Sequence, residues 1–422
     1  MQWHILTTSF PPYRGGLGFH SLHLAECLAQ KGDQVTIWSA FDPDKKLAIP
    51  KYVDSDRNKR VQYHHVAKEW NRQSLAYVAE QILKEKSHVV IQYRPKAFSV
   101  ASVRELISFS RSFKRMTRSN NSTAYVYVNV IIHRAIEHIP RNLDHPEQKR
   151  RKSTKGKNHS VSWQLIWMMA HDMIWQPIIQ LLNLSGLVYS SQRVLVTSSR
   201  LARRLRVITL RTSIHTMPVS SPITHKATPA QVANLRQAFL GDRALIIGTY
   251  SSFKEPEVLK ILAHVMVYLL KKNTNWLWLG FGRFAEPFFK FLASQHPDIS
   301  DRMQNSGELD HRAISAHISV CDIMFQPYYH GVSTQRASAM TILDHALPLV
   351  TSLGKYTEKI WQTTGCAQLI KWNAPHSYIS SLGVLGHNPN MRKNIGFVGK
   401  ETYDQHFAWQ RNIDVFTLTD QD

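Results

Sequence analysis

Cysteine is scarce in this sequence, and its few copies lie far apart. The chain has 422 residues and three cysteines, Cys27, Cys321 and Cys366. Their spacing fits no zinc-ligand pattern, and so few thiols cannot form the disulfide framework of a small secreted domain. We therefore expect reduced, partly buried cysteines in a reducing compartment.

Long hydrophobic runs are also missing. No segment reaches the roughly 20 consecutive apolar residues with which a helix crosses a bilayer. Residues 3–8 read as a short strand, and they lack the basic leader and apolar core of a signal peptide. There is no low-complexity tract and no fixed-period repeat. These absences predict a cytoplasmic protein, with peripheral contact to the inner face of the plasma membrane left open.

Acidic residues are the third shortage. Asp and Glu number 30 against 52 Lys and Arg, which gives a formal net charge of +22 and a sequence pI near 9.9. Such a positive field attracts nucleic acid, anionic lipid or a phosphorylated substrate. Charge alone does not choose between these partners.

The length and the pattern of the chain indicate two α/β domains. About 200 residues per domain is the natural division of 422 residues, and the 43% hydrophobic content is that of a globular protein. Strands that alternate with helices imply parallel sheets. The expected strands cover residues 3–8, 34–39, 88–92, 124–132, 193–198, 244–249, 276–280, 322–326 and 347–351, and the expected helices cover 19–31, 74–86, 101–116, 199–206, 257–272, 312–320 and 390–410.

A glycine-rich loop follows the first expected strand. Gly15, Gly16 and Gly18 come after Pro11-Pro12 and precede an amphipathic segment. Glycines let backbone N–H groups approach a bound anion or sugar, and the following helix start adds partial positive charge. A tight turn that binds nothing is the alternative.

A second loop follows the strand that opens the second half. It contains Thr249, Ser251 and Lys254 in the order Gly-Thr-Tyr-Ser-Ser-Phe-Lys. A lysine in a loop after such a strand would offer a positive charge to a bound anion. An ordinary surface lysine is the alternative.

A third loop lies between the strands expected at 322–326 and 347–351. Gly331, Ser333, Thr334 and Arg336 precede a segment of small residues that leads to His345-Ala346-Leu347-Pro348. Arg336 lies near an expected helix start, which itself attracts anions, and Ser333 and Thr334 would cap the helix or bind phosphate. The simpler interpretation keeps the cap alone and makes Arg336 a surface charge.

These blocks together resemble the GT-B glycosyltransferases, specifically the family 4 type that uses nucleotide-sugars. The resemblance is specific in residues 11–32, 248–254 and 331–348. It implies two Rossmann-like domains that face each other across a cleft: an acceptor-side domain at 1–217, a linker at 218–229 and a nucleotide-sugar-binding domain at 230–395. It also implies that the tail at 396–422 crosses back to the first domain.

The resemblance implies a retaining, metal-independent transferase that acts on a glycan or lipid-linked acceptor, as in cell-surface polysaccharide synthesis. Lys254, Arg336, Ser333, Thr334, Gly331, Thr249 and Ser251 would bind the donor, and Gly15, Gly16 and Gly18 would close over the cleft. His133, at the end of the strand expected at 124–132, would lie beside the reacting sugar. Tyr93 and Arg94, at the end of another strand, would line the acceptor side.

Three departures weaken the match. Thr249 stands where the family usually has an arginine, and both glutamates of the family signature are missing, with Thr341 in the second place. A variant of the signature without these glutamates fits better, and in it Arg336 would substitute for the missing arginine. A degenerate scaffold that only binds its ligand is therefore the alternative function.

No cofactor, metal or nucleic acid is expected as a partner. No RNA- or DNA-binding motif supports a nucleic-acid binder, and the glycine spacing does not fit a dinucleotide oxidoreductase. The basic run at 149–157, followed by Trp163, Trp167 and Trp175, is either a membrane-surface element or a loop before a buried helix.

Overall fold

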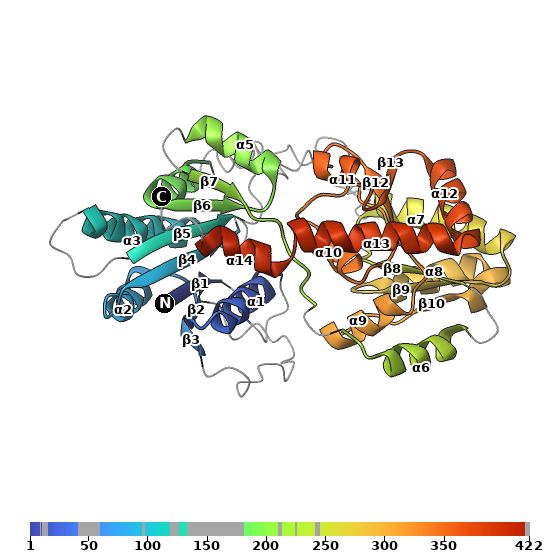
Figure 1. Ribbon diagram of the computed structural model, residues 1–422, viewed down its shortest axis with the longest axis horizontal. Coiled ribbons are helices and arrows are strands. Elements are labelled where there is room, and N and C mark those ends of the chain that lie inside the picture. Colours follow the sequence, from blue (N-terminus) through green and yellow to red (C-terminus); the bar gives the residue numbers. More distant parts are fainter. Residues whose placement is uncertain are drawn as a thin grey trace, which may run out of the picture. The chain divides into compact units, whose positions relative to one another are not determined.

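The chain forms two compact α/β units. The computed structural model describes residues 1–8, 10, 16–40, 60–94, 98–118, 126–132, 181–209, 213–223, 226–240 and 245–417. One unit comprises Met1–Thr197 and Leu201–Thr216, and the other comprises Ser198–Arg200 and Met217–Asp422. Each unit has its own parallel sheet (Figure 1).

The first unit contains a seven-stranded sheet in the order β3-β2-β1-β4-β5-β6-β7, and every strand pairing in it is parallel. Parallel strands are covered on both faces, so their sequences read as continuous apolar runs. All residues of β4 are buried, and its centre, Val89–Ile91, is an apolar run. The strands are β1 (Gln2–Thr7), β2 (Gln34–Ala40), β3 (Val61–Ala67), β4 (Ser87–Tyr93), β5 (Val126–Ile132), β6 (Arg193–Val196) and β7 (Ser213–Thr216).

Helices cover both faces of this sheet. α2 (Arg72–Ile82), α3 (Val100–Arg118), the helical residues 181–190 and α5 (Ser199–Ile208) place their apolar side chains in one core with alternate strand residues. The helix α1 (Gly16–Gln30) buries Leu24, Ala25 and Leu28 completely, but these side chains are not part of that core. Because successive side chains of a strand point to opposite faces, α1 lies on the other side of the sheet.

A buried histidine makes the stability of the first unit depend on pH. His4 in β1 is 4% exposed, and its Nδ1 accepts a hydrogen bond of 3.0 Å from Trp38 Nε1. Burial lowers the pKa of His4 to about 4. Between pH 6.5 and about 4 the unfolded chain binds a proton that the folded chain excludes, so stability falls as pH falls through this window.

We expect the wild-type chain to lose on the order of 2 kcal/mol from this residue between pH 7 and pH 5. The measurement compares urea midpoints at the two pH values for wild type and for His4→Gln, whose amide oxygen can still accept from Trp38. The variant should lose less stability than wild type. An equal loss in both proteins would contradict the assignment.

The second unit contains a six-stranded parallel sheet in the order β10-β9-β8-β11-β12-β13. Its strands are β8 (Leu245–Tyr250), β9 (Trp276–Phe281), β10 (Met303–Asn305), β11 (Ile323–Gln326), β12 (Leu349–Leu353) and β13 (Gln368–Lys371). Two cores, one on each face, hold alternate residues of the same strands: Ile247 and Trp278 belong to one, and Ile246 and Leu277 to the other.

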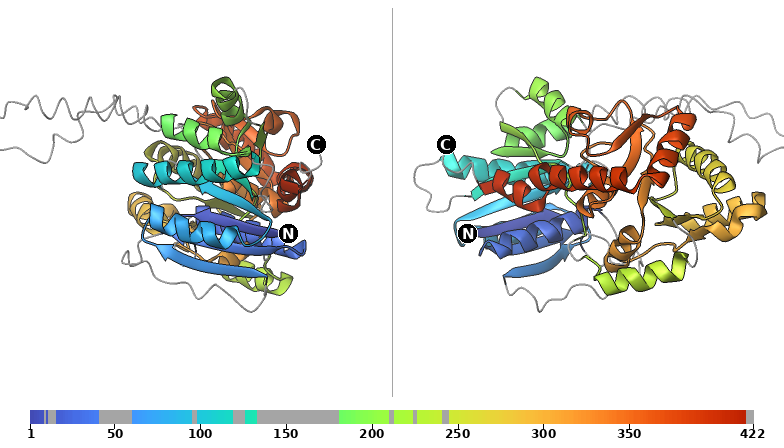
Figure 2. Two further views of the ribbon diagram at one scale, coloured as in Figure 1. Left: turned by 90° about the vertical axis from the view of Figure 1, so that its left-hand side faces the viewer. Right: turned by 45° about the vertical axis from the view of Figure 1, so that its right-hand side comes forward.

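Helices complete both cores of the second unit (Figures 1 and 2). α7 (Pro256–Lys272), α8 (Ala285–Gln295) and α12 (Pro375–His387) pack on one face. α9 (His311–Ser319), α10 (Ala337–Asp344) and part of α6 (Pro229–Leu240) pack on the other. The remaining elements are the 3₁₀ turn η3 (Pro297–Arg302), α11 (Lys359–Thr363), α13 (Pro389–His406) and α14 (Trp409–Thr417).

Three local expectations were wrong. The helix expected at 390–410 is two helices, α13 and α14, which follow one another in red in Figure 1 and are interrupted at the buried Phe407. α1 begins at Gly16 rather than at residue 19. The strands β3, β7, β10 and β13 were not foreseen: β3 carries no apolar run, and the other three have only three or four residues each.

The segment after Thr216 is held against the end of the chain. Ser220 Oγ donates to Phe407 O at 2.6 Å, and Asn412 Nδ2 donates to Pro218 O at 2.7 Å. Trp409 Nε1 donates to Ser221 O at 2.9 Å. Residues 218–221 are therefore fixed to the second unit through α13 and α14.

No helix in the described part of the chain combines the length and the apolar character needed to cross a bilayer.

Candidate functional site

Each sheet has a point where the strand order reverses. In the first unit β1 lies between β2 and β4, and in the second β8 lies between β9 and β11. Open parallel sheets bind ligands outside the carboxyl ends of the two strands at such a point. The loops after β8 and β11 carry the donor-site residues that the sequence predicted.

In the first unit, the glycine motif opens a helix. Gly16 is the first residue of α1, and Gly18 lies in its first turn, so both belong to the helix and not to the preceding loop. Gly15 and His133 lie outside the described residues. Their predicted roles therefore remain predictions.

The end of β4 presents one exposed and two buried side chains. Tyr93 is 2% exposed, packs in the core, contacts Phe98 and has its pKa raised to about 12 by burial. Arg94 is exposed. The Gln92 side-chain amide lies 3.3 Å from His20 Nδ1 and donates to it, which joins β4 to α1. Of the two residues predicted on the acceptor side, only Arg94 is exposed to solvent. The hydrogen bond between Gln92 and His20 was not predicted.

The ends of β8 and β11 are fastened together by side chains. Thr249 is fully buried, its hydroxyl donates to Phe325 O at 3.1 Å, and it accepts from Trp278 Nε1 at 3.0 Å. One residue on, Tyr250 N donates to Gln326 Oε1 at 3.0 Å. The hydroxyl of Thr249 is thus used inside the core, and its prediction as a donor-binding side chain is not supported by this position.

Lys254 is exposed in the loop after β8. Its ammonium lies 4.8 Å from the centre of the Phe284 ring, at the start of α8. Phe284 has a φ of 62° and is 48% exposed. A left-handed conformation is costly for a bulky residue, and the cation–π contact holds the ammonium beside the loop after β9. Sequence patterns gave no signal for this aromatic partner.

Ser251 belongs to a close contact between the loops after β8 and β9. Its backbone N–H donates to Phe281 O at 3.2 Å, and its hydroxyl accepts from Phe253 N at 3.3 Å. Gly282, with a φ of 124°, leaves no room for a Cβ against Ser251 O. These contacts fix the loop that carries Lys254.

Arg336 lies at the end of the loop after β11. Its guanidinium stacks on the Tyr328 ring with 4.7 Å between the guanidinium carbon and the ring centre. The Tyr328 hydroxyl shares a hydrogen bond of 2.8 Å with Ser338 in α10. Arg336 is the N-cap residue of α10, and no side chain caps this helix. The guanidinium and the first N–H groups of α10 therefore both offer positive charge at one place.

The Tyr328 ring belongs to the same loop as Arg336 and is buried beneath its guanidinium. Burial raises the pKa of Tyr328 to about 12; the hydrogen bond from Ser338 and the charge of Arg336 oppose this rise, whereas Tyr250 and Glu255 add to it. Glu255 adjoins Lys254 in the loop after β8, so a charge of this loop also acts on Tyr328. Tyr250, Glu255 and Tyr328 were missed because only their neighbours matched a motif.

Gly331 packs against the loop after β12. It has a φ of 89°, and an added Cβ would lie 2.5 Å from Gly354 N and closer still to Thr357 Oγ1. Tyr356 N donates to His330 O at 2.8 Å beside it. Only glycine fits this backbone conformation and spacing.

Ser333 and Thr334 do not cap α10, which corrects one of the two roles predicted for them. Thr334 donates to Glu358 through both its backbone N–H, at 3.0 Å, and its hydroxyl, at 2.7 Å. Ser333 is 6% exposed, and its carbonyl accepts from Arg336 N at 3.0 Å. Glu358 therefore anchors the loop, and nothing in the local sequence around Thr334 marked it as a partner.

Thr341 and His345, the next two residues of the signature, use their side chains for hydrogen bonds within the second unit. The Thr341 hydroxyl donates to Ala337 O at 2.9 Å within α10. His345 Nδ1 donates to Thr341 O at 2.7 Å, and its Nε2 lies 2.9 Å from Ser315 Oγ. Burial lowers the pKa of His345, so its neutral form joins α10 to α9.

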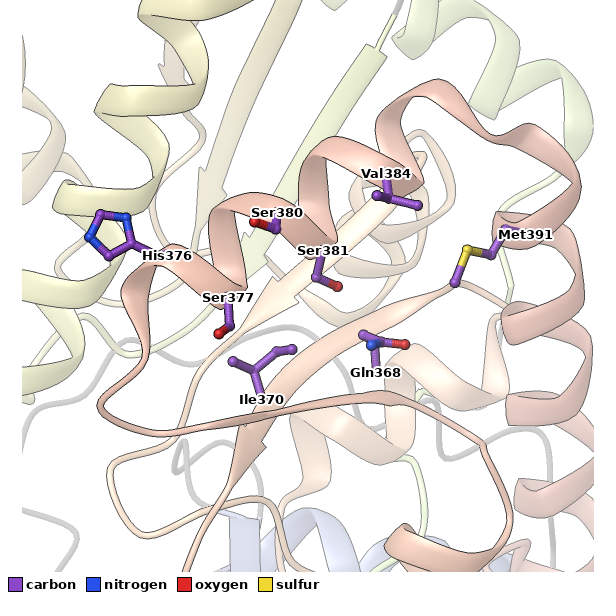
Figure 3. Close-up of a pocket in the computed structure, with 8 residues that line it drawn as sticks. All are labelled: Gln368, Ile370, His376, Ser377, Ser380, Ser381, Val384 and Met391. Carbon is purple, nitrogen blue, oxygen red and sulfur yellow. The ribbon is translucent and has the colours of Figure 1, made fainter.

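A separate cavity of about 440 Å³ lies along β13, two strands from β11. Figure 3 shows Ser377 and Ser381 on the face of α12 above Ile370 and Gln368. Neither lysine nor arginine lines this cavity. It is unsuited to a diphosphate and shares no residue with the loops after β8 and β11.

Comparison with solved structures places the fold among the GT-B glycosyltransferases, as the resemblance predicted. Sucrose-phosphate synthase from Thermosynechococcus elongatus superimposes with a TM-score of 0.67 at 13% identity, covering 100% of this chain and 98% of that one. HepE of Anabaena, in complex with UDP and glucose, gives 0.64 at 11% identity with 99% of each chain covered. WaaG, a glycosyltransferase involved in lipopolysaccharide biosynthesis, gives 0.60 at 10% identity with 100% of each covered.

No protein-family model and no curated protein matches the sequence. The chain therefore has two Rossmann-like units of the GT-B type, and its activity has to be argued from the site.

Proposed function

We propose that the chain is a retaining glycosyltransferase that moves a sugar from a nucleotide-diphosphate donor to a glycan or lipid-linked acceptor in cell-surface polysaccharide synthesis. The observation that carries the proposal is that Lys254 and Arg336 lie in the loops that follow β8 and β11, the two neighbouring strands that flank the reversal of strand order. The structures of HepE with UDP and with UDP-glucose support a nucleotide-sugar donor.

The proposed mechanism rests on charge. As the glycosidic bond breaks, the nucleoside diphosphate leaves with the bonding electrons, and the acceptor oxygen bonds to the sugar and loses its proton to the departing diphosphate. The Lys254 ammonium, the Arg336 guanidinium and the uncapped N–H groups of α10 would stabilise the departing diphosphate. We propose no role for a metal ion. His133 would orient the sugar or the acceptor.

The test is a donor panel. The full chain is incubated with UDP-, GDP- and ADP-sugars, with and without a chelator, and release of nucleoside diphosphate is measured. We expect one nucleotide to be released faster than in enzyme-free controls, with the rate unchanged by the chelator. If no donor is hydrolysed or bound, the proposal fails.

A binding protein on a degenerate scaffold is the second candidate. It is favoured by Thr249 and Thr341, whose hydroxyls are used for internal hydrogen bonds at the two places where the family has an arginine and a glutamate. Saturable binding of a nucleotide-sugar without release of diphosphate, with acceptors supplied, would select this candidate.

We also propose that the protein works at the inner face of the plasma membrane. The net charge of +22 supports this location, since an anionic leaflet attracts cationic proteins.

A further inference from the structure

A groove of about 420 Å³ lies on the first unit, between α3 and the helical residues 181–190. The two helices approach closely at Gly186, where an added Cβ would lie 2.8 Å from Ile107 Cδ1. The groove is lined by Arg104, Ile107, Ser108, Arg111, Ser112, Arg115, Leu182 and Gly186. It lies outside the elements that carry the predicted donor site.

Three arginines dominate the α3 side of the groove. Arg104, Arg111 and Arg115 are exposed, and their spacing places them on one face of α3, with Ser108 and Ser112 between them. In the part of the chain that the structure describes, none of the three guanidiniums has a carboxylate partner, and no acidic side chain lines the groove. Elsewhere the chain pairs such charges, as in Arg236–Asp322 and Arg283–Glu308.

The opposite side of the groove is apolar. Leu182 is 65% exposed, and Leu181 and Tyr189 on the same helix are 37% and 47% exposed. Residues 182, 186 and 189 share one helix face because they are separated by four and three positions. Large exposed apolar side chains beside a row of cations are unusual on a surface that meets only water.

We propose that this groove binds the phosphate headgroups of anionic lipids, so that α3 and residues 181–190 form the membrane-contacting surface of the first unit. Guanidinium groups bind phosphate oxygens through paired hydrogen bonds, and the serine hydroxyls add donors. Leucine enters the acyl boundary and tyrosine stays at the headgroup level. A soluble polyanion would use the arginines but would leave Leu182 and Tyr189 without a role.

This surface rests on the proposed membrane location, for which it would account, and lipid binding there does not depend on transferase activity. The experiment measures binding to vesicles. A negative result would therefore not affect the outcome of the donor panel. Equally, an inactive protein can still bind vesicles through this groove.

The experiment is co-sedimentation of the full chain with phosphatidylcholine vesicles that contain or lack phosphatidylglycerol. The test variant is Arg104→Gln/Arg111→Gln/Arg115→Gln. The matched control is Lys260→Gln/Lys271→Gln/Lys290→Gln, which removes the same charge from exposed lysines that already pair with Glu257, Asp298 and Glu286.

We expect wild type to bind only the vesicles with phosphatidylglycerol. The groove variant should bind about a hundredfold more weakly, from roughly fivefold per arginine, and the control should stay within about threefold of wild type. Leu182→Ser, with all charges kept, should weaken binding several-fold. Since every changed side chain is exposed, the melting temperatures should not move, and Arg111→Gln alone serves if the triple variant folds poorly.

Two results would overturn the proposal. One is equal loss in the groove variant and in the charge-matched control, which would assign binding to net charge. The other is binding of soluble pyrophosphate, abolished in the groove variant, without any binding of wild type to anionic vesicles.

Discussion

Replacing Lys254 or Arg336 by alanine is expected to weaken binding of the donor nucleotide by about 10- to 100-fold, because a charge-assisted hydrogen bond to phosphate contributes about 1.5–3 kcal/mol. Release of diphosphate from a nucleotide-sugar should fall by about 100- to 1,000-fold, since charge on the leaving group is largest in the transition state. Calorimetry with the nucleoside diphosphate and turnover assays with the sugar donor measure the two effects separately.

Arg336 and Lys254 are held in place by different contacts, so their conservative substitutions should have different effects. Arg336 is held by the Tyr328 ring and adjoins the start of α10, so lysine at this position would lose both the stacking and the forked donors. Lys254 is held by the Phe284 ring. Phe284→Leu keeps the charge but removes the ring, and it should cost less than loss of the ammonium itself.

Lys272 provides the matched control. Its ammonium also lies over an aromatic ring, 5.8 Å from the centre of Tyr268, but it belongs to the last turn of α7, at the end that leads into β9. Lys272→Ala should leave nucleotide affinity within about twofold of wild type, as is usual for surface substitutions. Unchanged affinity in both Lys254→Ala and Arg336→Ala would refute the placement of the diphosphate.

The buried strands and the loops that follow them could be predicted from the sequence. Runs such as Val89–Ile91 and Trp276–Gly280 are apolar throughout, as is typical of strands buried on both faces. The motif residues come directly after such strands. Their position at the carboxyl edge of the sheet could therefore be predicted as well. The edge strand β3 escaped because only its pairing with β2 makes it a strand.

The directions and partners of the site residues were harder to predict. Thr249 has the same parity as Leu245 and Ile247, so strand alternation could have placed its side chain in the core. In contrast, Glu358 bonds Thr334 across 24 residues of sequence, and Phe284 contacts Lys254 from the loop after β9. Such contacts depend on the packing of separate loops, which no local pattern encodes.

Gly331→Ala is expected to have the largest effect on the architecture of the site. The alanine would need a φ of 89°, and its Cβ would meet the backbone of Gly354, which cannot move aside as a flexible side chain can. We expect a loss of about 2–4 kcal/mol of stability, from strain and from separation of the loops after β11 and β12. Because Arg336 ends the same loop, nucleotide affinity should fall as well.

Gly365→Ala is the control that separates the effect of backbone strain from the effect of a steric clash at Cβ. Gly365 has a φ of 71°, but nothing lies within 4 Å of an added Cβ there, and its loop carries none of the predicted site residues. This variant should lose only about 1 kcal/mol, from backbone strain alone, and should bind nucleotide like wild type. Thermal unfolding and calorimetry on both variants make the comparison. If both lose the same stability, or if Gly331→Ala keeps full affinity, the contact between Gly331 and Gly354 does not shape the site.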